Sequence, residues 1–87
     1  MIGIRLSDGL PDPWPPSNGS YWKMQRLSSD DTLTWHGMTP NGLFCCLANH
    51  SAVEHEDGTV TISPSILCRQ TDFSWHGFLE RGVWREV

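Results

Sequence analysis

Positive charge is scarce in this chain of 87 residues. Ten Asp and Glu outnumber six Lys and Arg, and the formal net charge is −4. The basic residues are Arg5, Lys23, Arg26, Arg69, Arg81 and Arg85, and no two are adjacent. Direct nucleic-acid binding requires clustered cations that face the phosphates, so the sequence argues against it. An acidic surface favours a basic protein partner instead.

Long apolar runs are also missing. No segment approaches the about 20 apolar residues of a membrane span, and the N-terminus has no basic region followed by an apolar stretch. The three cysteines cannot all pair within one chain, and adjacent Cys45 and Cys46 would face opposite sides of a strand. We therefore expect reduced thiols, a cytoplasmic location and no membrane partner.

What the chain does contain is enough apolar material for one small folded domain, residues 1–87. Hydrophobic residues make up 38% of it, with five Trp and three Phe. Residues 7–20 hold four of the six prolines, which excludes a helix or central strand there. This segment is predicted to be an ordered surface arm with Trp14 as its anchor, and residues 21–87 are predicted to form a β body.

The remaining segments predict a mainly β fold with little helix. The stretch TLTWH alternates, GLFCCLA is typical of a buried strand, and Asp57-Gly58 separates two extended halves as in a hairpin. A second hairpin is expected around Glu80-Arg81, with Gly82 at positive φ. Residues 20–27 are compatible with a strand or a short helix. We expect an antiparallel sheet or barrel of about five to six strands.

One ten-residue pattern occurs twice. Trp-His-Gly, four residues, Gly, an aliphatic residue and an aromatic residue begin at Trp35 and again at Trp75. Each copy predicts a strand, a turn and a strand. Because neighbouring strand residues face opposite ways, both Trp are expected to face the core, and His36 and His76 to share the other side. The simpler interpretation is two similar hairpins whose histidines only hydrogen-bond the backbone.

Cysteines near these histidines raise a second interpretation. His36, Cys45 or Cys46, Cys68 and His76 form a set of four ligands of the kind that zinc prefers. A structural zinc would stabilise a core as small as this one. Against it, the chain has neither Cys-x-x-Cys nor a histidine pair at zinc-finger spacing. The predicted metal ligands are thus His36, Cys45, Cys68 and His76.

The segments WHGMTPNGLFCCLANH, TVTISPSILC and WHGFLERGVW resemble an uncharacterised family of small bacteriophage and bacterial domains. Phage members are often loosely labelled ammonia monooxygenase-like. The resemblance covers about residues 34–85, and the matching positions are Ser63, Pro64, Ser65, Ile66, Cys68, His76 and Gly82. The chain departs from the family at the first turn, where many members have several cysteines and this one has His36. The resemblance implies a β-rich domain with a metal site and leaves the activity open.

Two classes of function follow. The first is binding: five Trp exceed what so small a core encloses, so Trp14 and Trp84 are expected to be partly exposed, as interface residues often are. Nearby acids would attract a basic host protein. The resemblance to phage domains implies that such a binder would inhibit a bacterial defence system, as anti-CRISPR proteins do. The acids predicted to bind are Asp30, Asp31, Glu54, Glu56 and Asp57.

The second class is catalysis. A zinc-dependent hydrolase would use His36, Cys68 and His76 as ligands with Glu54 or Glu80 as base. Catalysis could also proceed without a metal, with Cys68 as nucleophile and His76 as base. The remaining alternative is an accessory domain with a purely structural zinc.

Overall fold

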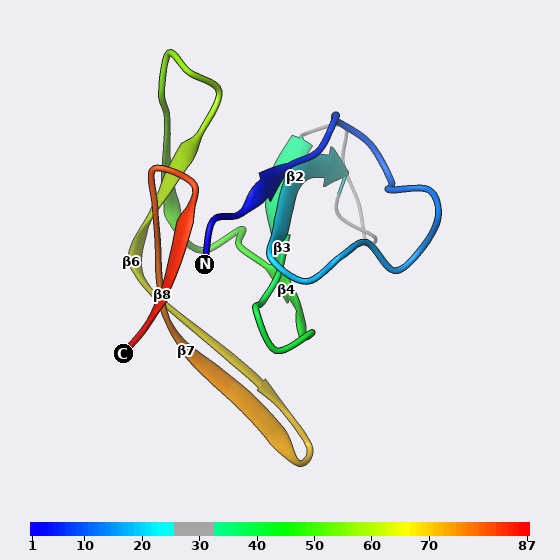
Figure 1. Ribbon diagram of the computed structural model, residues 1–87, viewed down its shortest axis with the longest axis vertical. Coiled ribbons are helices and arrows are strands. Elements are labelled where there is room, and N and C mark those ends of the chain that lie inside the picture. The colour runs from blue at the N-terminus through cyan, green and yellow to red at the C-terminus, as the bar shows by residue number, and fades with distance from the viewer. Residues whose placement is uncertain (26–32) are drawn as a thin grey trace.

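A computed structural model describes residues 1–25 and 33–87 as two four-stranded β-sheets (Figure 1). The strands are β1 (Ile4–Arg5), β2 (Ser20–Gln25), β3 (Leu33–Met38), β4 (Phe44–Cys46), β5 (Ser51–Glu54), β6 (Val60–Gln70), β7 (Phe73–Glu80) and β8 (Val83–Glu86). One sheet has the order β1-β2-β3-β4 and the other β5-β6-β7-β8. The described part of the chain contains no helix, and hence none that could cross a membrane. The predicted mainly β class is confirmed, but the described residues form eight strands in two sheets where about five to six strands were expected.

Every neighbouring pair of strands is antiparallel except β1–β2, which is parallel. The predicted hairpins at Asp57-Gly58 and around residue 81 are both present, with Gly58 at φ 86°. In the second hairpin, Arg81 (φ 46°) and Gly82 (φ 74°) both have positive φ, as the two-residue turn favoured between twisted strands requires. Pro64 lies where pairing of β6 with β7 shifts between Ile62 and Ile66, consistent with the bend expected there.

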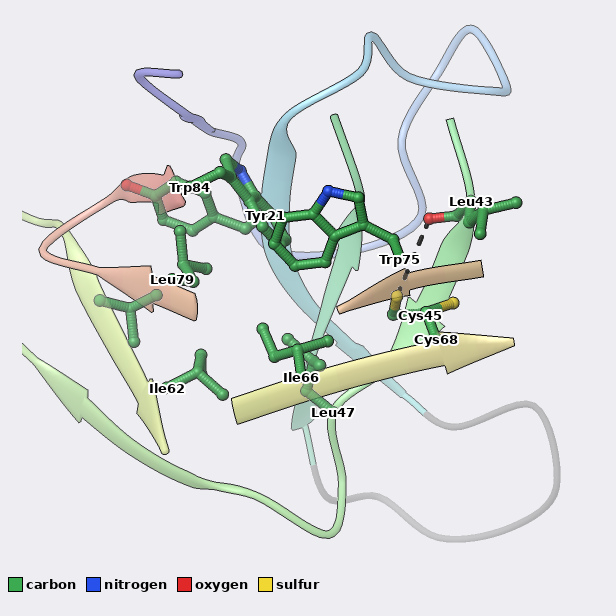
Figure 2. Packing of buried hydrophobic residues seen from close by; sticks show 11 residues of the cluster. Tyr21, Leu43, Cys45, Leu47, Ile62, Ile66, Cys68, Trp75, Leu79 and Trp84 are labelled. Atoms are coloured by element: carbon green, nitrogen blue, oxygen red, sulfur yellow. Dashed lines mark hydrogen bonds between the residues drawn. The ribbon is translucent and has the colours of Figure 1, made fainter. Parts of the chain in front are cut away.

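Residues 20–25, which the sequence left open between strand and helix, form strand β2. Its alternation buries Tyr21 in the core between the sheets, and Trp22 and Met24 on the opposite face. The main core, drawn in Figure 2, combines side chains of both sheets: Tyr21, Leu43, Cys45, Leu47, Val60, Ile62, Ile66, Cys68, Trp75, Leu79 and Trp84. Burial of this apolar surface is the main stabilising term.

The proline arm covers the other face of the first sheet. It leaves β1 and returns as β2, a parallel neighbour, and appears in Figure 1 as a wide loop beside that sheet. Backbone hydrogen bonds fasten both ends, from Gly9 N to Lys23 O (2.7 Å) and from Gly19 N to Met38 O (2.7 Å). In its middle, Trp14 lies edge-on to Trp22. Residues 7–20 thus lie against the first sheet, with Trp14 in contact with Trp22 and Phe44.

Both copies of the Trp-His-Gly pattern form hairpins, β3–β4 and β7–β8, but their loops differ in length. Residues 39–43 connect the first pair, whereas Arg81-Gly82 alone connect the second. The longer loop shifts the alternation, so the two copies differ after the turn. Leu43 is buried in the main core while Val83 is exposed. The repeat therefore specifies two hairpins without making them equivalent.

The glycine that follows each histidine makes room for a tryptophan ring. A Cβ at position 37 would lie 2.9 Å from Trp84 Cη2, and one at position 77 would lie 2.5 Å from Trp75 Cη2. Both distances are shorter than the approach of nonbonded carbon atoms. In both copies of the pattern, a glycine leaves the space that a bulky indole occupies. This way of fitting tryptophan into a small core explains why the pattern is used twice.

Replacing Gly77 by alanine tests this packing. The new Cβ would also clash with the backbone carbonyl oxygen of Arg85 and with Glu86 Cα (2.9 Å), so β8 must move as well as the Trp75 ring. Overpacking costs about 1–3 kcal/mol, and we expect Gly77→Ala to lower the free energy of unfolding by about 3 kcal/mol in urea denaturation. The control is Gly9→Ala, where φ is +107° and no atom lies within 4 Å; backbone strain alone costs about 1–2 kcal/mol there. Equal losses in the two variants would contradict the packing role.

Candidate functional site

The predicted metal ligands fall on different faces of the two sheets. Cys45 and Cys68 both lie in the main core, where their sulfur atoms are neighbours in Figure 2. Burial, and then a hydrogen bond with the Cys68 thiol, raise the pKa of Cys45 well above its ordinary value. Each thiol also has a backbone acceptor, Leu43 O for Cys45 (3.8 Å) and Phe44 O for Cys68 (3.4 Å). Its surroundings therefore keep Cys45 a neutral thiol, whereas metal binding and nucleophilic attack need a thiolate.

The two histidines lie away from these thiols. His36 is buried on the arm-covered face of the first sheet, stacked on Phe44 (5.6 Å between ring centroids), with Nδ1 2.8 Å from Thr34 O. His76 is exposed on the second sheet, with Nε2 3.1 Å from Ser65 Oγ. The expectation that they meet is wrong, because each faces away from the core on a different sheet. Among residues 1–25 and 33–87, no group of three His, Cys, Asp or Glu could hold a metal ion.

The proposed Cys68–His76 pair is separated in the same way. Cys68 pairs with Trp75 across the β6–β7 ladder, and Leu67 pairs with His76. Adjacent positions on a strand point to opposite faces, so the imidazole of His76 lies on the other side of the sheet from the Cys68 thiol. The structure gives no nucleophile and base in contact at this position.

Separate roles for the histidines predict additive effects of substitution. His36→Ala removes an aromatic stacking partner and a hydrogen bond, and we expect a loss of about 2 kcal/mol in the free energy of unfolding. His76→Ala alters only an exposed side chain, and we expect a change within about 0.5 kcal/mol. In the double variant the two changes should sum within about 0.5 kcal/mol. Strong non-additivity in urea denaturation would instead indicate a shared metal.

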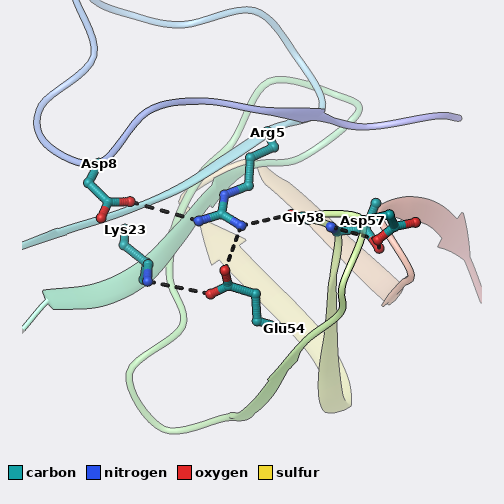
Figure 3. Close-up of polar contacts among 7 residues, drawn as sticks. Arg5, Asp8, Lys23, Glu54, Asp57 and Gly58 are labelled. Atoms are coloured by element: carbon teal, nitrogen blue, oxygen red, sulfur yellow. Dashed lines mark hydrogen bonds and ion pairs between the residues drawn. The ribbon is translucent and has the colours of Figure 1, made fainter.

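The acids at the β5–β6 turn are mostly engaged within the protein, as Figure 3 shows. Glu54 accepts hydrogen bonds from Arg5 Nη1 (3.1 Å) and Lys23 Nζ (3.4 Å). Arg5 Nη1 also donates to Gly58 O at 2.7 Å. The Asp57 carboxylate accepts from Thr59 N (3.0 Å) and Thr59 Oγ1 (2.6 Å) and so stabilises its own turn.

Glu56 and Asp57 are both exposed at this turn and form no ion pair within the described residues, and the Asp57 carboxylate is hydrogen-bonded to Thr59 instead. Asp30 and Asp31 lie outside the described residues. The acidic turn therefore serves mainly to join the second sheet to the N-terminal segment.

The network around Glu54 predicts a pH dependence of stability. Hydrogen bonding from Arg5, with the charge of Lys23, lowers the pKa of Glu54 below its ordinary value of 4.5. Since the folded pKa is the lower one, this stabilisation is complete above the pKa of the unfolded chain and is lost as pH falls through the folded value. We expect Glu54→Gln to lose less stability than wild type between pH 6 and pH 3 in urea denaturation. Glu56→Gln is the control and should follow wild type; a wild-type profile for Glu54→Gln would contradict the role of the network.

The two tryptophans expected to be exposed behave differently. Trp14 is 48% exposed, as predicted. Trp84 is only 2% exposed, so its expected exposure is wrong. The two-residue turn pairs Leu79 with Trp84, which places the indole on the inward face of β8. There its Nε1 donates to Gly19 O at 2.8 Å.

A cavity of about 430 Å³ lies between the N-terminal segment and the arm. The four prolines of the arm line it together with Leu6 and Leu10, and Asp8 and Asp12 contribute carboxylates. Ser20 also lines it, is 1% exposed, and has a buried hydroxyl with no hydrogen-bond partner in the described residues. The proline spacing predicted an arm, but no sequence signal indicated that the arm lines an open cavity.

Trp14 projects from the arm between two prolines that line this cavity. Its ring is held edge-on by Trp22 (6.2 Å between centroids) and by Phe44 (5.5 Å). Aromatic contacts of this geometry contribute about 0.5–1.5 kcal/mol each. The arm therefore presents a half-exposed indole in a defined position beside the cavity, which makes it the candidate functional site.

Comparison with protein-family models, curated proteins and solved structures finds no match to this chain.

Proposed function

We propose that the protein acts by contact with a basic protein partner, through the proline arm. The observation that carries this proposal is Trp14, a half-exposed aromatic side chain held in place by Trp22 and Phe44. Interfaces concentrate their binding energy in such residues, and prior immobilisation lowers the entropy cost of binding. Asp12 lies two positions away on the same arm and supplies negative charge.

The distribution of charge supports a basic protein over nucleic acid as partner. The net charge is −4, and three of the few cations are already paired within the protein: Arg5 and Lys23 with Glu54, and Arg85 with Glu80. Paired cations contribute little to phosphate binding. An acidic surface accelerates association with a positively charged partner.

The resemblance to phage domains makes the proposal more specific. A small acidic phage protein of this kind would act in the cytoplasm of the bacterial host and cover the positively charged nucleic-acid channel of a defence complex, such as a CRISPR effector. The resemblance, the acidity and the arm together support an inhibitor. The hydrolase and structural-zinc alternatives lack a ligand cluster among the described residues.

Partner contact is tested by substituting the arm tryptophan. We expect Trp14→Ala to weaken binding to a purified CRISPR effector complex at least about tenfold, because truncating an interface hot spot costs about 2 kcal/mol or more. The matched control is Phe73→Ala, another aromatic side chain that is 67% exposed but lies on the β6–β7 hairpin. Binding would be measured by biolayer interferometry at two salt concentrations.

Inhibition is tested in cells whose CRISPR system targets a plasmid. Wild-type protein and Phe73→Ala should restore transformation by that plasmid, and Trp14→Ala should not. If wild-type protein leaves transformation at the level of an empty vector, the anti-defence proposal is overturned. If Trp14→Ala inhibits as well as wild type, the arm is not the contact surface.

A further inference from the structure

We infer that the open cavity lined by the arm receives a lysine side chain of the partner, an inference that rests on the proposed function. The cavity is about 430 Å³, within the range of about 300–1,000 Å³ for small-ligand sites. Its walls combine the prolines of the arm with leucine side chains, and its charged groups are carboxylates. A flexible apolar stem that ends in a compact cation matches this combination.

The unpartnered hydroxyl of Ser20 gives the cavity a polar group suited to an ammonium. Ser20 alternates with Tyr21 on β2 and so shares the arm-covered face with Trp22. A buried hydroxyl without a hydrogen bond is unfavourable, and a ligand that supplies one removes that cost. An ammonium group has three N–H donors and no acceptor, so it can donate to the Ser20 oxygen and to a carboxylate together.

The two carboxylates of the cavity differ in their availability. Asp8 Oδ1 lies 3.9 Å from Arg5 Nη2, so its charge is partly compensated. Asp12 has no ion pair with a described residue and lines the cavity. No Lys or Arg lines the cavity. Asp12 is thus the principal counter-ion for an incoming cation, and the charge of the site selects against anions.

The experiment is an NMR titration of the 15N-labelled protein with three amino-acid derivatives. N-acetyl-lysine methylamide should cause saturable shifts at backbone amides of residues 6–20. N-acetyl-norleucine methylamide, which keeps the aliphatic stem but lacks the charge, should bind at least about threefold more weakly. N-acetyl-arginine methylamide should also bind more weakly, because its planar guanidinium does not match a single hydroxyl and carboxylate. Binding of norleucine or arginine as tight as that of lysine would overturn the inference.

Variants assign the effect to the two polar groups. Asp12→Asn should weaken lysine-derivative binding about threefold and leave the norleucine derivative unchanged. Asp72→Asn, an exposed acid on the β6–β7 turn, should have no effect. Ser20→Ala should weaken binding but raise the melting temperature, since it removes a buried unpartnered hydroxyl. A lower melting temperature, or unchanged binding in both cavity variants, would overturn the assignment.

The titration needs no partner, so its result is separate from that of the proposed function. Absence of lysine-specific shifts, with loss of effector binding in Trp14→Ala, would overturn the lysine site and leave partner contact standing. Lysine-specific shifts without any effector binding would support the site and overturn the proposed partner.

Discussion

The indole of Trp84 joins the two sheets, and much of the fold depends on its placement. Its Nε1 donates to Gly19 O at 2.8 Å, its ring lies edge-on to Trp75 at 5.5 Å, and position 37 approaches it so closely that a Cβ there would lie 2.9 Å away. Its backbone carbonyl accepts from the amino group of Met1 at 3.0 Å. Strand β8 is thereby tied to β2, β3 and the N-terminal segment. Since Gly19 ends the arm, the same indole also fixes where the arm returns to the sheet.

The first sheet, β1-β2-β3-β4, is covered on both faces. Trp84 and its neighbours cover one face, and Leu6 together with Trp14 of the arm covers the other. An arm of this composition has little tendency to form regular structure of its own. Its order comes from tertiary contacts, and these contacts also create the cavity that Ser20 lines. The placement of the arm and the cavity beside it therefore have the same origin.

Charge is divided between structural and surface roles. Glu54 holds Arg5 and Lys23, and these cations also lie over the Trp35 ring at 4.8 Å and 5.4 Å from its centroid. This arrangement removes positive charge from the surface available to a partner. The carboxylates that remain free, such as Asp12, lie on the arm beside its exposed aromatic group. The free carboxylates and the exposed indole therefore lie together on the arm, as the proposed contact with a basic partner requires.

Local sequence signals determined the all-β class, the turns at Asp57-Gly58 and at Arg81-Gly82, and the surface arm, because each depends on the conformational preferences of a few adjacent residues. The same signals placed each histidine opposite its neighbouring tryptophan. Only the tertiary structure decided which sheet each strand joined. Because β3 and β7 lie in different sheets, His36 and His76 point away from each other. The tertiary structure also decided the burial of Trp84. A shift of one residue in strand register moves a side chain from the exposed face of a strand to the buried face. The arm cavity likewise exists only where distant segments pack, which no local pattern encodes.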